Sequence, residues 1–425
     1  MAKRISGGLL ACVLLVFMAS SASAVTVDFH GKAMAGVLSS SNSYLLGGDD
    51  SDSATIGVGK FRFRTEVGTD DEMVKMVYGF ETGANNFGDT ETDPAGESGW
   101  GYSGDSVDFE NRFAYIQTAI PGFDDTMFGR AGLQKTGVNH WLWTETAAGV
   151  TLHGKGEVNW QAGWFRGYEE NWGEDGSQDT DLYTVRADFS PASNITMGGF
   201  GVYAFDFGDE KDFARDADQY WLGATGSLDG PVFISGDLIY QGGDAEVGGT
   251  DDVSAYLVNA TMGTELTDRT RVSFNALYVS GDDDPNDGDQ EAFQSIDADV
   301  KVGQIFFKDS LAASMDRFVD DMFGQKQSYD EMKNNGLFNL AVEGEVQVDA
   351  KNNLRGAVRY METAEEYQGD DELGVELDLW YSHKLNDNLT LKLEGAYLLS
   401  GDLAEEMFET DNDVYQVGAG MVFAF

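Results

Sequence analysis

The chain contains little cysteine and little proline: one cysteine, Cys12, and five prolines among 425 residues. Cys12 lies within residues 1–24, which combine a basic start, an apolar core of about ten residues and an A-x-A ending, the pattern of a secretory signal peptide. We therefore expect residues 1–24 to be cleaved and residues 25–425 to form one exported domain. That domain would have neither disulfides nor thiolate metal sites, because it contains no cysteine.

Long apolar runs and cations are also scarce. Beyond residue 24 no apolar run approaches the ~18 residues of a membrane-spanning helix, so the sequence predicts none. Acids outnumber Lys and Arg by 74 to 27, for a formal net charge of −47, which excludes nucleic acid as a partner. Such acidity is typical of disordered chains, but 12% aromatic residues and 53 glycines indicate strands joined by tight turns instead.

What the chain does contain is a series of segments, each of about ten residues, that alternate between apolar and polar side chains. Phe61 and Phe63 would share one face of such a strand, while Arg62 and Arg64 would share the other. The last segment, residues 414–425, has one apolar face and ends on an aromatic residue. We count about 16–18 segments, which predicts an all-β fold.

The connections between these segments alternate in length. Short connections rich in turn residues alternate with long acidic ones, which places the turns at one end of an up-and-down meander and the long loops at the other. We therefore predict a transmembrane antiparallel β-barrel of about 16–18 strands, closed by pairing of residues 414–425 with residues 25–38. A soluble β-sandwich is the alternative, and it needs no such segregation of loops. The long connections are residues 39–57, 84–107, 167–179, 207–218, 281–336 and 401–413.

The longest connection, residues 281–336, contains one helical pattern. Apolar side chains recur at helical spacing within residues 309–324. We expect a short helix there that packs this extracellular loop onto the barrel rim; binding of a partner is the alternative.

The positions predicted to face the inside of the barrel carry charges of both signs. A barrel of this width leaves an aqueous channel, and a wall of mixed charge orients water and ions within it. Salt bridges that only hold the wall together are the alternative interpretation. The cations are Lys60, Arg62, Arg64, Arg112, Arg130, Arg186, Arg271, Arg355 and Arg359, and the acids are Glu66, Glu81, Glu110, Asp188, Glu376, Asp378 and Glu394.

One stretch resembles the general trimeric porins of outer membranes. It comprises residues 111–116 (NRFAYI), 121–123 (PGF) and 128–130 (FGR). The whole pattern, with its terminal Phe425, is similar to the homotrimeric porins of sulfate-reducing (Desulfovibrio-type) bacteria. The resemblance implies a homotrimer in the outer membrane of a Gram-negative cell, and an inward-folded constriction loop.

The resemblance implies that this loop is residues 131–146 and that arginines line the constriction. The loop departs from the general pattern, because it has a single acid and two tryptophans. The resemblance also implies that Phe423 and Phe425 form a signal for the barrel-assembly machinery. A weak hint agrees with trimerisation, since the small residues Gly31, Ala33 and Ala35 share the outer face of the first strand. The candidate pore residues are Arg62, Arg64, Arg112, Arg130, Lys135, His140, Trp141, Trp143 and Glu145.

Metal and catalytic signals are weak. Residues 282–291 (DDDPNDGDQE) partly match a calcium loop, but the twelfth position is Phe293 rather than Glu. Asp282, Asp284 and Asp287 are therefore weak metal candidates, and we expect no cofactor, with loosely bound calcium as the alternative. No G-x-S-x-G motif or paired histidines are present, so we expect no enzyme.

Three hypotheses of function remain. The first is an outer-membrane porin whose water-filled channel passes small hydrophilic solutes and ions by diffusion through the lipid bilayer. The second is a substrate-specific channel in which Trp141, Trp143 and Tyr102 stack on sugars. The third is a structural or adhesive surface protein whose long loops carry the function.

Overall fold

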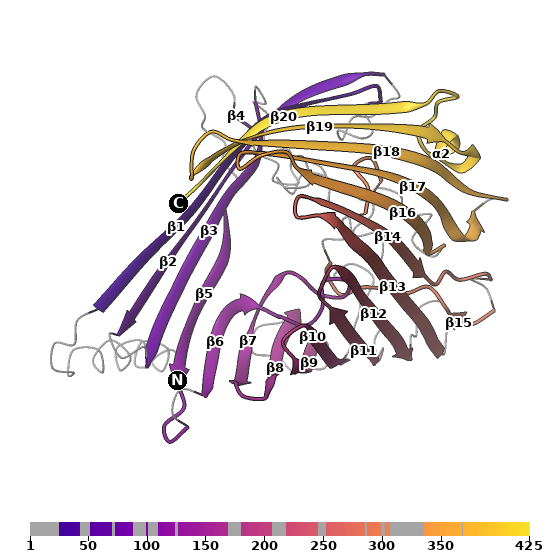
Figure 1. Ribbon diagram of the computed structural model, residues 1–425. Coiled ribbons are helices and arrows are strands. Elements are labelled where there is room, and N and C mark those ends of the chain that lie inside the picture. Colours follow the sequence, from indigo (N-terminus) through magenta and orange to yellow (C-terminus); the bar gives the residue numbers. More distant parts are fainter. Residues whose placement is uncertain are drawn as a thin grey trace, which may run out of the picture.

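The computed structural model describes residues 25–42, 52–69, 73–87, 99–100, 109–123, 126–168, 180–205, 218–244, 252–284, 287–298, 302–306, 335–367 and 369–425. Their strands form one sheet of 20 strands, of which β4 (Gly99–Trp100) and β15 (Asp289–Gln290) have only two residues each. The other 18 strands make an antiparallel wall around a central opening (Figure 1). The predicted fold class and strand number are confirmed.

The wall strands have the following bounds: β1 Val25–Ser40, β2 Ala54–Thr69, β3 Val74–Phe87, β5 Phe109–Ala119, β6 Met127–Lys135, β7 Thr146–Gly154, β8 Val158–Tyr168, β9 Thr180–Ala192, β10 Ile195–Phe205, β11 Gln219–Leu228, β12 Val232–Gly243, β13 Asp252–Thr267, β14 Thr270–Val279, β16 Leu337–Gln347, β17 Asn352–Tyr367, β18 Asp370–Lys384, β19 Leu389–Ser400 and β20 Val414–Ala424. One short helix, α2, spans Asp402–Met407. In the described part of the chain, no helix has the length and hydropathy of a membrane span. The helix expected at 309–324 lies outside the described residues.

The barrel closes where the sequence predicted it would. β20 pairs antiparallel with β1, from Lys32 opposite Ala424 to Ser40 opposite Gln416. Beyond the last ladder pair, the Phe425 N–H donates to the Gly31 carbonyl at 3.0 Å, and the Gly31 N–H donates back at 2.9 Å. Closure satisfies the backbone groups of both terminal strands, which an open edge would leave without partners.

The connections segregate by length as predicted, with one exception. Short turns such as residues 193–194, 229–231 and 385–388 share one end of the barrel with the start of β1 and the end of β20. The opposite end carries the long connections. There β17 and β18 form a tight hairpin in which Tyr367 pairs with Asp370, whereas the other connections at that end are long.

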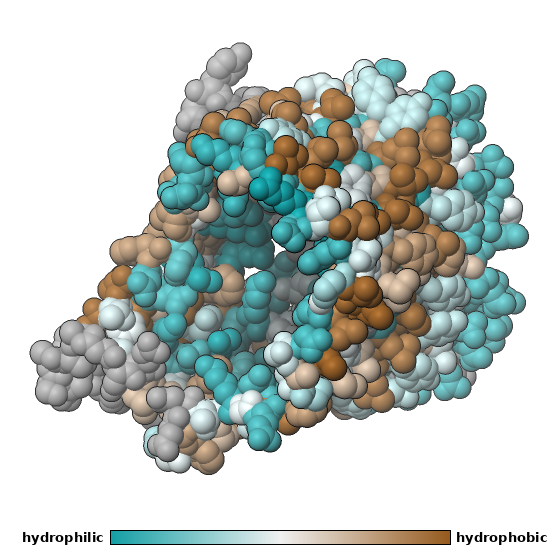
Figure 2. All heavy atoms as spheres, in the orientation of Figure 1, coloured by the Kyte–Doolittle hydropathy of each residue, from teal (hydrophilic) through white to brown (hydrophobic). Residues whose placement is uncertain are grey.

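The outer face of the wall is apolar and uncovered. On β20, Tyr415, Val417, Met421 and Phe423 are exposed, whereas Val414 and Gln416 point inward and are buried. Figure 2 shows hydrophobic residues over much of the outer wall and hydrophilic residues around the opening. Other exposed apolar side chains include Val185, Leu222, Leu238, Met262, Val342, Leu379 and Leu393.

The inner face is only partly polar, which corrects the expectation of a charged inner wall throughout. Several strands turn large apolar side chains inward, among them Phe165 of β8 and Trp221 of β11, both fully buried. They form one cluster with residues of three long connections, including Leu142, Phe306 and Phe408. These connections fold into the barrel and exclude water from the apolar part of the wall, which the strand pattern alone does not reveal.

Candidate functional site

Cations crowd the inner wall at β2, β3 and β5. Lys60 and Arg62 both form ion pairs with Glu81, and Lys60 and Glu81 are almost fully buried. Arg112 reaches the same carboxylate at 3.9 Å and Glu145 at 3.3 Å. One carboxylate is thus shared by three cations, and Arg112 also pairs with Glu110 and Glu145, so three cations and three carboxylates share this part of the wall.

Arg112 owes its position to a β-bulge. In the β3–β5 ladder, Gly79 lies opposite Phe113 and Phe80 lies opposite Asn111, so Arg112 has no partner in the register. A bulge re-aims the side chains beside it. Here it directs Arg112, whose side chain is 12% exposed, toward Glu145 in the connection after β6.

Two other predicted cations lie apart from this group. Arg64 pairs with Glu66 at 3.1 Å, and Glu66 also binds Lys75. Arg130 of β6 donates to Gln117 at 2.9 Å and packs over the Tyr115 ring. Lys135 ends β6 and is exposed, and it lines a cavity of about 250 Å³ with Arg62, Arg64 and Arg112.

The predicted constriction loop is shorter than residues 131–146. Residues 131–135 continue β6, and residue 146 begins β7, because these two strands pair out to Lys135 opposite Thr146. The loop itself is residues 136–145. The β6–β7 pairing extends past the predicted loop boundaries because the alternation of side chains continues on both strands. The family resemblance did not take this local signal into account.

This loop contacts the distant strand β12. The amide of Asn139 donates to Asp237 at 2.9 Å, and the indole N–H of Trp141 donates to the same carboxylate at 3.2 Å. Asn139 also accepts the Trp141 backbone N–H at 2.8 Å, which fixes the loop in a tight turn. Sequence analysis did not single out Asp237, which lies 98 positions from Asn139.

The two predicted pore tryptophans are largely buried. Trp141 is 7% exposed and Trp143 is 5% exposed, with Leu142 fully buried between them. The Trp143 ring meets Phe165 of β8 edge to face, with centroids 5.3 Å apart. Both rings therefore act mainly as packing groups that seat the loop on the wall, while Tyr102 lies outside the described residues.

A second inward segment was missed by sequence analysis. Residues 291–298, which follow β15, run beside residues 136–145: the Thr144 N–H donates to the Asp297 carbonyl at 2.8 Å, and the Ile296 N–H donates to Leu142 at 2.9 Å. Residues 302–306 then lie against β18, where Phe306 packs on Phe408, just after α2, with ring centroids 5.5 Å apart. One sequence signal for this inward segment was available in β11. There Tyr220, Trp221 and Leu222 place apolar side chains on both faces of the strand.

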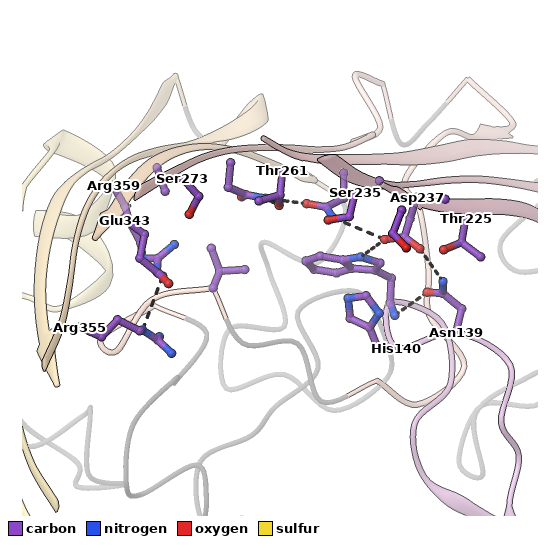
Figure 3. A pocket seen from close by; sticks show the side chains of 18 of the residues that line it. Asn139, His140, Thr225, Ser235, Asp237, Thr261, Ser273, Glu343, Arg355 and Arg359 are labelled. Carbon is purple, nitrogen blue, oxygen red and sulfur yellow. Dashed lines mark hydrogen bonds and ion pairs between the residues drawn. The ribbon is translucent and has the colours of Figure 1, made fainter. Parts of the chain in front are cut away.

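Between these inward segments and β9–β17 the lumen retains a cavity of about 570 Å³. Figure 3 shows Arg355, Arg359 and Glu343 grouped at one side, and Asn139, His140 and Asp237 at the other. Glu343 lies 3.5 Å from both arginines, and Arg359 also binds Asp378 at 2.9 Å. The wall between the two groups carries the uncharged polar side chains Ser235, Thr261, Ser273 and Asn275, and Thr225 and Ser227 line the cavity on β11, beyond Asp237.

A hydrogen-bonded row of amides runs along this wall. Asn339 donates to Asn275 at 3.1 Å, Asn275 donates to Asn259 at 2.8 Å, and Asn259 lies 3.5 Å from Asp237. The row crosses β16, β14, β13 and β12: Asn259 lies directly opposite Asp237, and the other two pairs are diagonal neighbours, two residues apart in the register. A water-filled passage with ionic groups at both sides and neutral hydrogen-bonding groups between can carry polar solutes.

The acidic stretch at 282–291 does not form a metal cluster in the part of the chain that the structure describes, where no group of three His, Cys, Asp or Glu side chains is arranged to hold an ion. Asp282 accepts the Asp284 backbone N–H at 3.2 Å, and Asp287 accepts that of Asp289 at 2.8 Å. Burial raises the pKa of Asp282, and the nearby Asp287 carboxylate adds to the effect. These contacts indicate a self-bonded acidic turn.

His140 predicts a pH dependence. Burial lowers its pKa; Asp237 opposes this shift and Arg186 adds to it. A histidine whose pKa is lower when folded than when unfolded stabilises the fold above about pH 6.5, and this contribution is lost as the pH falls. Between pH 7 and pH 5 the thermal unfolding midpoint of the wild type should therefore fall more than that of His140→Gln. Equal falls in both proteins would contradict a lowered pKa of His140, whose side chain is open to the lumen.

No protein-family model and no curated protein matches the sequence. Solved structures do match the fold. The BenF-like porin from Pseudomonas fluorescens Pf-5 aligns with a TM-score of 0.58 at 9% identity, over 94% of this chain and 98% of that one. OccK8 (OprE) of Pseudomonas aeruginosa and OpdK of the same species, solved with vanillate, each align with a TM-score of 0.56 at 10% identity, with the same coverage. The chain thus has the fold of outer-membrane porins.

Proposed function

We propose that the chain is an outer-membrane porin that passes small hydrophilic solutes and ions by diffusion. The observation that carries this proposal is a closed barrel with an apolar outer face and a polar and ionic cavity of about 570 Å³ in its lumen. A barrel of 18 strands is too wide for side chains alone to fill. An uncovered apolar outer face is stable in lipid and costly in water.

Two aromatic belts support placement in a membrane. Near the long connections, outward tyrosines bond to acids at the strand ends: Tyr203 donates to Asp218 at 2.5 Å, and Tyr397 donates to Asp413 at 2.6 Å. At the opposite end lie apolar rings such as Phe423 and Phe425. Rings with a polar tip suit the boundary between hydrocarbon and water. We assign the long connections to the cell exterior.

Planar bilayers provide the direct test. Purified protein should insert in steps of current whose size scales with salt concentration, as expected for a water-filled lumen. A correctly folded preparation that yields no current steps would reject the porin function.

Arg112 and Arg130 should set part of the ion selectivity. In the double variant Arg112→Ala/Arg130→Ala, two positive charges leave the lumen while Glu81 and Glu145 remain, so selectivity should shift toward cations. The reversal potential in a salt gradient measures this shift, and Lys384→Ala, an exposed cation at the end of β18, serves as the control. An unchanged reversal potential in the double variant would remove both arginines from the selectivity site.

A substrate-specific channel is the second candidate. The inward segments narrow the lumen, and one structure of the same fold is of OpdK with vanillate. Burial of Trp141 and Trp143 argues against sugar stacking on them, so selectivity would come from the ionic and amide groups of the cavity. Saturable block of ion current by one class of solute would favour this candidate. Permeation in which each solute passes independently of the others and without saturation would favour the general porin.

The remaining expectations stay predictions. Homotrimer formation is one of them, and the hint from the small residues Gly31, Ala33 and Ala35 of β1 is neither strengthened nor removed by their pairing with β2. An adhesive role for residues 281–336 must allow for Phe293, Ile305 and Phe306, which are buried inside the barrel. Contact with the barrel-assembly machinery, loosely bound calcium and the lack of enzymatic activity likewise await experiment.

A further inference from the structure

The second inward segment is fastened to the wall at one carboxylate. The backbone N–H groups of Gln304, Ile305 and Phe306 donate to Glu376 of β18 at 2.5, 2.9 and 3.1 Å. Glu376 is 0% exposed. Successive backbone N–H groups that point the same way form an anion-binding concavity. Here the acceptor in the concavity is a side-chain carboxyl of the same chain, about 70 positions away along the sequence.

Side-chain contacts secure the same segment. The amide of Gln304 donates to the carbonyls of Leu379 at 3.2 Å and Gly395 at 3.0 Å, on β18 and β19. A Cβ added at Gly303 would lie 2.7 Å from a Glu376 oxygen, so the backbone can approach the carboxylate this closely because residue 303 is glycine. Gly303 thus allows the backbone to approach Glu376, and Gln304 holds it there through bonds to β18 and β19.

Removal of the Glu376 carboxyl would leave the N–H groups of residues 304–306 without an equally good acceptor. The three N–H groups would lose the Glu376 carboxyl as acceptor in a site from which water is excluded. Asp378 beside it binds Arg359 at 2.9 Å through one oxygen, and its other oxygen accepts the Gln304 N–H, at 3.3 Å. Residues 302–306 would then be held by the bonds of Gln304 to Asp378, Leu379 and Gly395 and by apolar contacts, while the N–H groups of Ile305 and Phe306 would lose their acceptor.

We propose that Glu376 is a positioning residue, a latch that holds residues 302–306 inside the barrel and thereby limits the size of the solutes that pass. This inference rests on the proposed porin function for its consequence, but the latch itself is a property of the fold. Glu376 does not line the large cavity, so its effect on permeation would act through the segment that it holds.

A cysteine probe tests the latch separately from channel activity. Ile305→Cys introduces a thiol into a chain that has no other cysteine after residue 24, at a side chain that is 3% exposed. A water-soluble maleimide should label it slowly. With Glu376→Ala added, labelling should become about tenfold faster or more, because the hydrogen bonds from the N–H groups of residues 304–306 to the Glu376 carboxyl are lost. Single-channel conductance of Glu376→Ala should also rise, and liposomes should admit larger sugars.

Two further variants keep the test decisive. Glu394→Gln removes an acid from neighbouring β19 and should label like the parent; labelling as fast as in Glu376→Ala would mean that any lost charge loosens the segment. Glu376→Gln retains one acceptor oxygen and should label at an intermediate rate, which also covers failure of Glu376→Ala to fold. Equal labelling in the Glu376 variants and the parent overturns the latch. A parent that labels slowly but carries no current overturns the porin function alone.

Discussion

Replacing Asp237 with alanine should release residues 136–145 from the opposite wall. Asn139 and Trp141 are almost fully buried and would each lose the acceptor for a side-chain donor. An unsatisfied buried donor costs about 1–3 kcal/mol. Asp237 itself is only partly buried, so water would replace part of the loss. We expect a total destabilisation of about 1–3 kcal/mol and a noisier, larger current per channel.

A double-mutant cycle isolates the contact. Trp141→Phe keeps a ring and removes the indole N–H, so it should cost less in the Asp237→Ala background than in the wild type. Asp229→Ala provides the matched control, because Asp229 is an exposed acid in the turn that leads into β12. Additive effects of Asp237→Ala and Trp141→Phe on the unfolding midpoint would show that the indole bond does not hold the loop.

The part of the fold that sequence predicts is the part set by local geometry. Alternation places Phe61 and Arg62 on opposite faces whatever the rest of the chain does, since successive side chains on a strand point opposite ways. The same rule placed Glu376 inside the barrel, whereas Arg112 owes its position to a β-bulge that alternation does not reveal. Strand number, closure and loop segregation follow from repeating that rule along the chain.

The part that sequence does not predict depends on contacts between distant segments. Nothing near Asp237 indicates that Asn139 and Trp141 will reach it, and nothing near Glu376 indicates that residues 304–306 will. The aromatic rings of the first loop were expected at a pore surface, but the apolar inner face of β8 and β11 offered them a packed site instead. A strand that is apolar on both faces is the one local sign that something covers its inner side.

The end of the chain now has a structural role beside its predicted role as an assembly signal. The ring of Phe425 covers Gly31, where an added Cβ would collide with it, and Phe425 is 49% exposed. About half of a phenylalanine burial is therefore at stake, roughly 1 kcal/mol. Phe425→Ser should lower both surface levels in cells and the urea midpoint of refolded barrels, while conductance per assembled channel stays unchanged.

Gly31→Val separates the two roles, because it keeps the terminal phenylalanine but displaces its ring. If Phe425 acts by packing across the β1–β20 seam, Gly31→Val should lower the urea midpoint in detergent, where no assembly machinery is present. Ala131→Val places the same side chain at an exposed outer position on β6 and should leave the midpoint unchanged. A normal midpoint for Gly31→Val, together with poor assembly of Phe425→Ser in cells, would show that the ring serves recognition rather than closure.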